Sequence, residues 1–329
     1  DVHSHINGAR ASEIFRDVMD LYGIERVHSM SRLPEAAAVR RTLGDRVRFI
    51  AVPDYGSEDR TYAMREGFLE GIRIFREEYD ARILKFWAAP RLRDFVDAQT
   101  FADVGALDAP WRRKAADLAV DLGMTLMVHV ADPDTWFATK YADASVYGTK
   151  AQQYEALERM LETYTCPWLA AHMGGWPEDL ACLDTPLGRY DHLHLDTSAT
   201  RWMIRELSKH PRADLVDFLT RWKGRILFGS DIVTNDEHLQ RNEPDGKTFA
   251  ADLASGPREA FDLYASRYWA LRTMWETDYD GESPISDPDL AMVDPETHTE
   301  TDAPPLRGKS IPDDLLDALY AQAALGLYG

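Results

Sequence analysis

Eight short apolar runs, most of them separated by amphipathic stretches, constrain the fold of this chain more than any other feature. We expect strands at residues 1–7, 26–30, 47–53, 82–87, 125–130, 168–172, 192–197 and 225–230. Helical periodicity lies between most of them, in residues 11–22, 109–123, 152–164 and 212–222. Strands that alternate with helices indicate a parallel sheet. Eight of them favour a closed (β/α)8 TIM barrel, an α/β fold, over an open doubly wound sheet, because no Gly-x-Gly-x-x-Gly motif follows the first strand.

The chain is longer than such a barrel requires. It has 329 residues, and a (β/α)8 barrel takes roughly 250. We therefore expect one barrel domain over residues 1–275, an acidic, proline-rich excursion over 276–305, and a closing C-terminal helix of the same domain within 306–329. Few apolar residues occur in 276–305, so this stretch is expected to be a solvated loop, with a lid or a subunit contact as the alternative.

The composition limits the partners of the chain. The formal net charge of −19 argues against binding to nucleic acid or to an anionic membrane. A small-molecule substrate is the expected partner, and a homodimer remains open. No run approaches the ~18 consecutive apolar residues of a membrane span. Two cysteines, Cys166 and Cys182, do not make a disulfide framework, so a reducing, cytoplasmic location is expected. No signal peptide is visible, although residue 1 already lies in a predicted strand and a leader could have been removed.

Histidines at the ends of predicted strands indicate a metal site. His3 and His5 are two residues apart on the first strand, so both imidazoles face the same side. Zinc accepts neutral imidazoles as ligands. A single His-x-His pair is also compatible with two ordinary polar residues at a strand end.

Three later strands strengthen this interpretation, because they end in His129, His172 and Asp231. The C-terminal ends of the strands carry the active site of a barrel. A lone buried histidine is most often a satisfied core residue, but four histidines and an aspartate, each at a strand end, are hard to explain as separate accidents.

Together these motifs resemble a known family. Asp-x-His-x-His lies on the first predicted strand, a histidine on the fifth, His-Met-Gly-Gly (172–175) on the sixth, Asp-Thr-Ser (196–198) on the seventh and Phe-Gly-Ser-Asp (228–231) on the eighth. The set is similar to that of the amidohydrolase superfamily. The most similar branch is the amidohydrolase-related group that includes aminocarboxymuconate-semialdehyde decarboxylase and the resorcylate decarboxylases. The resemblance spans about residues 1–235 and is specific as an ensemble.

The resemblance implies a catalytic metal site. It makes His3, His5, His129 and Asp231 the ligands of one divalent ion, most simply Zn²⁺, with Mn²⁺ or Fe²⁺ as alternatives. This set leaves a position open for water, as a catalytic site requires. Asp231 would accept the proton of that water. His172 becomes either a further ligand or the catalytic acid or base.

Four further residues are candidates for substrate binding. Lys85 lies within the apolar fourth strand, and we expect it to bind a substrate carboxylate. The alternatives for this lysine are a carbamate that bridges two metals, as in some members of the superfamily, or a side chain that reaches a carboxylate or water. Four tryptophans, Trp87, Trp136, Trp176 and Trp202, follow strand ends, and of these we expect Trp136 and Trp176 to line an aromatic pocket. Arg201, like Arg32, could clamp a substrate carboxylate, or could be an ordinary surface arginine.

Three further histidines are expected to be structural. His192 and His194 form a second His-x-His pair with Asp196 on the same face, but they precede the strand end. We expect barrel-wall roles for the two histidines, with Asp196 nearest the site. His28 ends the short second strand and is expected in the core or at the rim.

The same ligands support two reactions. The first is hydrolysis of an ester, lactone or amide bond in a small, possibly carboxylated, substrate. The second is non-oxidative decarboxylation of a carboxylated aromatic or muconate-like substrate. Gly175 stands where the aromatic decarboxylases are expected to carry Glu, and His3 differs from members with Glu at that position, which favours hydrolysis. A catalytically inactive barrel that only binds is the third alternative, and the complete ligand set argues against it.

Overall fold

The main sheet of the protein is parallel and curls into a barrel. The computed structural model describes residues 1–240 and 253–328. The strand order is β8-β7-β6-β5-β4-β3-β2-β1-β9, and every pairing in this sheet is parallel. The strands are β1 (Ser4–His5), β2 (Val27–Ser29), β3 (Val47–Ala51), β4 (Ile83–Trp87), β5 (Thr125–His129), β6 (Trp168–Ala170), β7 (Leu193–Asp196), β8 (Ile226–Leu227) and β9 (Ile232–Val233).

The eighth strand is interrupted, and the interruption closes the ring. Residues 225–230 were expected to form one strand, but β8 pairs with β7 whereas β9 pairs with β1. Between them, the carbonyl of Phe228 accepts the amide of Val2 at 2.9 Å, and the amide of Asp231 donates to the carbonyl of His3 at 2.8 Å. Asp231 has a positive φ of 59°, so the backbone turns there and cannot continue as a regular strand. The predicted (β/α)8 barrel is confirmed, and this break divides the expected eighth strand into β8 and β9.

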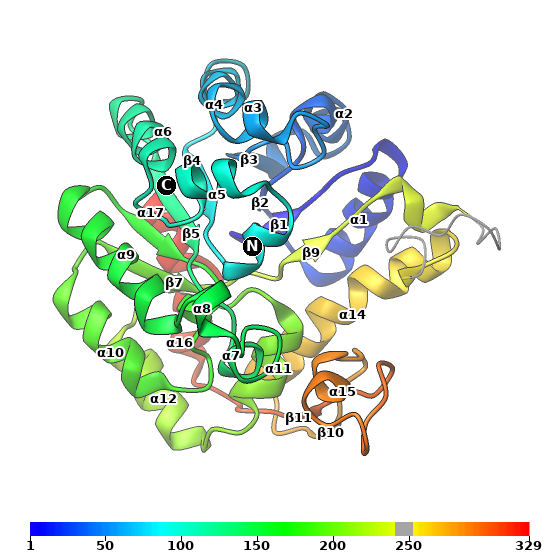
Figure 1. The fold of residues 1–329 in the computed structure, drawn as a ribbon. Helices are drawn as coiled ribbons and strands as arrows, with labels where there is room; N and C mark the ends of the chain where they lie inside the picture. Colours follow the sequence, from blue (N-terminus) through cyan, green and yellow to red (C-terminus); the bar gives the residue numbers. More distant parts are fainter. Residues whose placement is uncertain (241–252, 329) are drawn as a thin grey trace.

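Helices surround the barrel (Figure 1). Those before β9 are α1 (Ala9–Tyr22), α2 (Leu33–Leu43), α3 (Arg60–Met64), α4 (Glu66–Tyr79), α5 (Ala98–Val104), α6 (Pro110–Asp121), α7 (Asp134–Ala138), α8 (Ala144–Tyr147), α9 (Lys150–Thr163), α10 (Leu180–Arg189), α11 (Thr200–Leu207) and α12 (Arg212–Arg221); α14 (Pro257–Glu276) follows it. Local signals set their ends. Helix α9 begins with a capping box between Thr149 and Gln152, and Gly23 ends α1 in a left-handed conformation.

Two apolar layers stabilise the fold. The outer layer lies between strands and helices and contains large buried side chains such as Phe49, Phe86 and Trp168. The inner layer fills the barrel, and its residues come from successive strands: Val2, Met30, Ile50, Ile83, Met127, Leu169 and Leu227. Alternation along each strand separates the two sets, because neighbouring side chains face opposite sides of the sheet.

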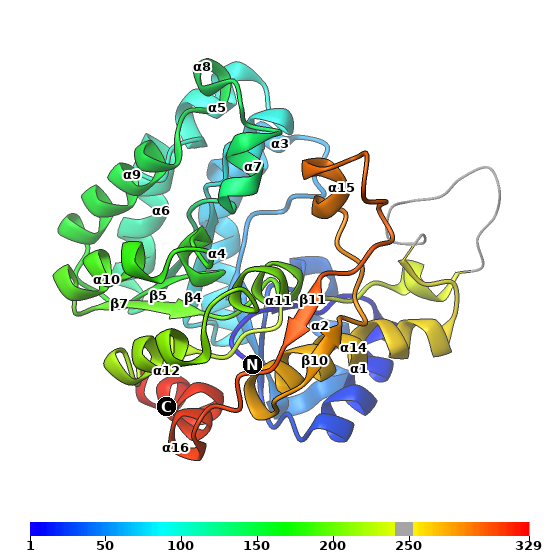
Figure 2. The same cartoon turned by 90° about the horizontal axis from the view of Figure 1, so that it is seen from below.

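The C-terminal part crosses from one end of the barrel to the other. After α14, β10 (Asp280–Glu282) pairs antiparallel with β11 (Pro305–Arg307), and α15 (Asp289–Val293) lies between them. Then α16 (Asp313–Asp317), a π turn (Ala318–Gln322) and α17 (Ala323–Tyr328) follow. Ala323 and Leu327 pack on the inner layer, so α17 closes one end of the barrel while α15 lies toward the other (Figure 2).

The predicted domain limits, 1–275, 276–305 and 306–329, include residues 241–252 and 329, which lie outside the described residues. Among the described helices, none is long and apolar enough to cross a membrane.

The inner layer gives a direct test of the packing. Leu169→Ala removes a fully buried side chain from the barrel interior, and we expect it to lower the free energy of unfolding by about 2–5 kcal/mol. Leu21→Ala is the matched control: Leu21 is 62% exposed on α1, so its truncation should change stability by less than about 0.5 kcal/mol. Urea denaturation measures both, and equal effects would contradict a packed barrel interior.

Candidate metal centre

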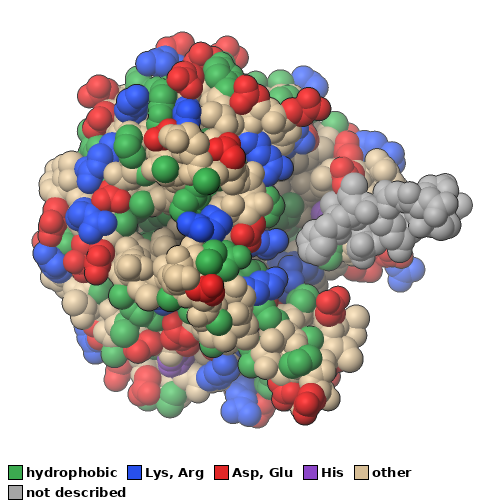
Figure 3. Space-filling model, viewed as in Figure 1, with side chains coloured by type: hydrophobic (Ala, Val, Ile, Leu, Met, Phe, Trp, Pro, Cys, Tyr) green, Lys and Arg blue, Asp and Glu red, His purple; other side chains and the backbone are tan. Residues whose placement is uncertain are grey.

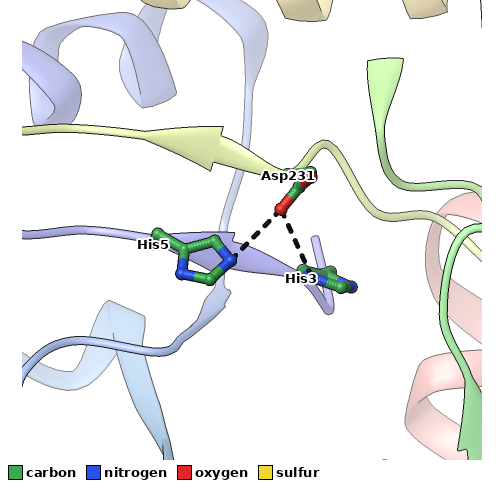
Figure 4. Close-up of side chains that lie close together, drawn as sticks. All are labelled: His3, His5 and Asp231. Carbon is green, nitrogen blue, oxygen red and sulfur yellow. Dashed lines mark ion pairs between the residues drawn. The ribbon is translucent and has the colours of Figure 1, made fainter. Parts of the chain in front are cut away.

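Three side chains meet where the barrel closes. His3 directly precedes β1, His5 ends it, and Asp231 lies in the break between β8 and β9 (Figure 4). The Oδ1 atom of Asp231 is 3.4 Å from Nε2 of His3 and 3.2 Å from Nε2 of His5. One ligand atom from each of the three residues lies within 4.8 Å of the other two. Two imidazole nitrogens and a carboxylate oxygen are the donors that a divalent transition metal prefers, so this cluster could hold such an ion.

A second group shares His3 and lies deeper. The carboxylate of Asp196, at the end of β7, accepts a hydrogen bond from Nδ1 of His3 at 2.9 Å. Its other oxygen accepts the backbone amides of His172 at 2.9 Å and Ser198 at 3.0 Å, and also the hydroxyl of Ser198. Asp196 therefore fixes the proton of His3 on Nδ1 and leaves Nε2 to face Asp231, which is the arrangement that orients a metal-binding histidine.

His172 lies beside this pair. Its ring centroid is 4.7 Å from that of His3, and its Nδ1 is 2.8 Å from the hydroxyl of Ser198. His172, His3 and Asp196 form a second group of possible ligand atoms within 4.8 Å of one another. His172 and Asp231 both have a positive φ. Such backbone strain in non-glycine residues is typical of functional sites, where the surrounding structure enforces it.

Charges in the cluster suit metal binding. Burial lowers the pKa of His3 and, more strongly, that of His172. The nearby His129 lowers the pKa of His172 further. Burial alone would raise the pKa of Asp231, but the hydrogen bond from His5 and the nearby His3 hold that pKa well below its usual range. The site thus favours neutral imidazoles beside an ionised carboxylate, the protonation states that metal ligands require.

Lys85 reaches the same cluster from β4. It is only 5% exposed, and its Nζ is 3.0 Å from Nε2 of His3. Burial lowers the pKa of Lys85 to about 8, against the opposing effect of Asp231 and Asp196. The predicted substrate-binding lysine therefore lies at the centre of the site, beside a predicted metal ligand.

His129 lies at the edge of the site. Its Nε2 is 2.8 Å from the carboxylate of Asp132, whose other oxygen accepts the hydroxyl of Tyr141 at 2.6 Å. The ring of His129 is 4.7 Å from that of His172. Among the described residues, His129 belongs to neither group of possible ligand atoms, so its predicted role as a ligand is not tested by this geometry.

An aromatic cluster covers His129 and His172. The ring of Trp202 is 5.9 Å from that of His129 and 5.7 Å from that of His172. The ring of Trp136 packs on Trp202 at 6.2 Å. The indole nitrogens of both tryptophans donate to Oδ2 of Asp289, at 2.8 and 3.0 Å.

Asp289 belongs to α15, so the acidic excursion contributes directly to this aromatic cluster. Arg205 on α11 joins it by donating to Asp289 at 3.1 Å and to Asp287, which is 1% exposed. Sequence reasoning missed both carboxylates, because no local pattern links residues 287 and 289 to strand ends. It also favoured Trp176 over Trp202, although both follow strand ends.

The other two predicted substrate-binding residues make their contacts elsewhere in the described structure. The ring of Trp176 packs on Tyr154, with a centroid distance of 4.5 Å, and its indole nitrogen donates to Asp134 at 3.2 Å. Arg201 is half-buried near the start of α11, and its charge acts on Asp287 and Arg267. The two histidines expected in the barrel wall contact backbone carbonyl oxygens: Nε2 of His192 is 3.2 Å from that of Leu161, and Nδ1 of His194 is 3.3 Å from that of Trp168.

Of the three comparisons, only the one with solved structures finds similar proteins. No family model and no curated protein matches the chain. An amidohydrolase from Burkholderia multivorans with bound zinc is 12% identical, with a TM-score of 0.45, and the match covers 100% of this chain and 98% of that one. A 2,6-dihydroxybenzoate decarboxylase from Rhizobium is 14% identical, with a TM-score of 0.41 and coverages of 85% and 84%. A 5-carboxyvanillate decarboxylase from Novosphingobium aromaticivorans, complexed with manganese, is 14% identical, with a TM-score of 0.39 and coverages of 66% and 69%.

The chain resembles amidohydrolases and aromatic-acid decarboxylases. These solved structures carry the names of the groups that the sequence motifs resemble. Their identities and TM-scores are low, so the function has to be argued from the residues of the chain itself.

Gly175 gives a test of the turn that carries His172. A Cβ at Gly175 would lie 2.1 Å from the carbonyl oxygen of Ala131, and φ is +75°. Gly175→Ala should therefore lower the free energy of unfolding by more than about 2 kcal/mol. Gly123→Ala is the matched control, because φ is +69° there but nothing lies within 4 Å of the added Cβ; it should cost only about 1 kcal/mol. Thermal denaturation of both variants separates the clash from the backbone strain, and equal losses would show that the clash is absent.

Proposed function

We propose that the protein is a metal-dependent enzyme that holds one divalent ion between His3, His5 and Asp231. The observation that supports this most directly is the convergence of their three ligand atoms at the C-terminal end of the barrel strands. Zn²⁺ suits this nitrogen and oxygen set best, and Mn²⁺ or Fe²⁺ share it. His129 is the proposed fourth ligand.

The proposed reaction is hydrolysis of an ester, lactone or amide in a small, possibly carboxylated, substrate. A bound divalent ion would polarise the substrate carbonyl and make a water more acidic. Asp231, whose pKa is depressed, stays ionised and can accept the proton of the attacking water. With Nδ1 engaged by Ser198, His172 would use Nε2 to pass a proton to the leaving group; a role as a further ligand is the alternative.

We assign substrate binding to side chains other than the metal ligands. Lys85 would pair with a substrate carboxylate, and Trp136 with Trp202 would contact its apolar part. Trp176 and Arg201 remain further candidates for substrate binding. Acidic and basic side chains are interspersed over the face of Figure 1, as Figure 3 shows. This mixed surface supports access by an anionic substrate despite a net charge of −19.

Metal removal tests the first proposal. Purified protein should contain about one equivalent of a divalent metal by elemental analysis, and a chelator should lower its Tm by several degrees, since a ligand at 100 times its Kd contributes about 2.7 kcal/mol. His5→Ala should lose the metal and no longer respond to the chelator. His210→Ala is the control: His210 follows α11, its Nε2 is 2.8 Å from the carbonyl oxygen of Pro177, and the variant should keep the metal and the response to the chelator. A metal-free parent with a chelator-insensitive Tm would leave only the binding-barrel alternative.

Substitution of His172 tests the acid–base role. His172→Ala should keep the metal and lower kcat by about 10²–10⁴-fold on whichever ester, lactone or amide of a test panel is hydrolysed. Asp262→Asn, at an exposed position on α14, is the control and should retain activity. If His172→Ala also loses the metal, His172 is a ligand. Release of carbon dioxide from an aromatic carboxylate in the same panel would replace hydrolysis by decarboxylation.

A further inference from the structure

A cavity lies at the end of the barrel opposite to the metal cluster. Its volume is about 250 Å³, and the first residues of three neighbouring strands line it. Arg26 precedes β2, Arg48 is the second residue of β3, and Arg82 precedes β4. Because parallel strands begin at the same end of a barrel, these three guanidinium groups lie around one opening, away from the C-terminal strand ends that carry the metal cluster.

Two aromatic side chains form the inner wall of this cavity. His28 on β2 is 8% exposed, and its ring centroid is 4.9 Å from that of Tyr328 on α17. Neither Nδ1 of His28 nor the hydroxyl of Tyr328 has a hydrogen-bond partner within the described residues, although both atoms are buried. Burying such groups without partners costs free energy, so a ligand that bonds to both would remove this cost.

The charge of the cavity favours an anion. Three arginines and only one carboxylate, that of Asp80, are among the residues that line the cavity. Asp80 also pairs with Arg76, and its Oδ2 is 3.4 Å from Nη2 of Arg82. Burial, with the nearby charges of Arg26 and Arg48, lowers the pKa of His28 to about 3. The ring is therefore neutral at pH 7 and can donate from one nitrogen. A positive cavity stands out in a chain whose net charge is −19.

We propose that this cavity binds a small oxyanion, a phosphate or carboxylate group, held by Arg26, Arg48 and Arg82 and hydrogen-bonded by His28 and Tyr328. Guanidinium groups bind the oxygens of such anions in pairs, and the volume admits a ligand of small-metabolite size. The three arginines lie at the starts of their strands, whereas His5 and Asp231 lie at the opposite ends of theirs, so the proposal does not depend on the proposed function.

Anion titration of the metal-loaded full chain tests the proposal. Inorganic phosphate and citrate, added at constant ionic strength against sodium chloride, should each be followed by calorimetry and by Tm. Saturable binding of phosphate alone would identify a phosphate site, and of citrate alone a carboxylate site. Because either anion could also bind the metal centre, His5→Ala must retain this binding.

Variants at the cavity locate the binding. Arg48→Ala should weaken the Kd by about tenfold or more, since each bond to a charged group contributes that much. Arg41→Ala, at an exposed position on α2, is the matched control and should leave the Kd unchanged.

Tyr328→Phe distinguishes ligand binding from a structural role. Removing the unpartnered hydroxyl should leave the Tm of the anion-free protein unchanged or higher, while it weakens anion binding. A hydroxyl that only stabilises the fold would lower that Tm instead. The proposal is wrong if neither anion binds saturably, if Arg41→Ala weakens binding as much as Arg48→Ala, or if His5→Ala abolishes it.

Discussion

The buried carboxylate of Asp196 joins the parts of this barrel on which the site depends. It receives the ring of His3 from the first strand, the backbone amide of His172 after the sixth, and both the amide and hydroxyl of Ser198 after the seventh. A carboxylate that is 0% exposed is tolerated only when its charge is fully hydrogen-bonded. Burial would raise its pKa, yet His3 and the other positive or donating groups around it hold the pKa far below the usual range. Stability and the orientation of His3 therefore rest on the same bonds.

Much of the site could be predicted because strand ends in a barrel converge. The spacing of His3 and His5, and the positions of His172 and Asp231 after apolar runs, predict that these residues lie close together, as they do in the structure. Trp202 and Trp176 could not be told apart in this way. Both follow strand ends, and the direction of each ring is set by the local backbone. His172, Met173, Gly174 and Gly175 all have positive φ, and this turn leaves Trp176 against Tyr154, whereas Trp202 in α11 packs on the histidines.

The excursion was the part least accessible to sequence reasoning. Its low apolar content indicates solvent, and most of its acidic residues are exposed or half-buried. Asp287 and Asp289 differ because Arg205 and two indole nitrogens come to them from α11 and α7. These partners are more than 80 residues away in the chain, so composition alone cannot distinguish a buried acceptor from a solvated charge. In this protein, an acidic loop holds the aromatic side chains beside the catalytic histidine candidates.

The break between β8 and β9 has a consequence for how the protein acquires its site. His3 and His5 come from the beginning of the described chain and Asp231 from a position more than 220 residues later, and they meet only where the sheet becomes a ring. Contacts of such separation are the slowest to form, because the chain entropy lost in closing the loop must be overcome first. A nascent chain that has not yet been synthesised past Asp231 lacks the carboxylate that completes the cluster. Ion uptake would then report the last stage of folding. A divalent ion bound there would link the first strand of the barrel to the segment between β8 and β9.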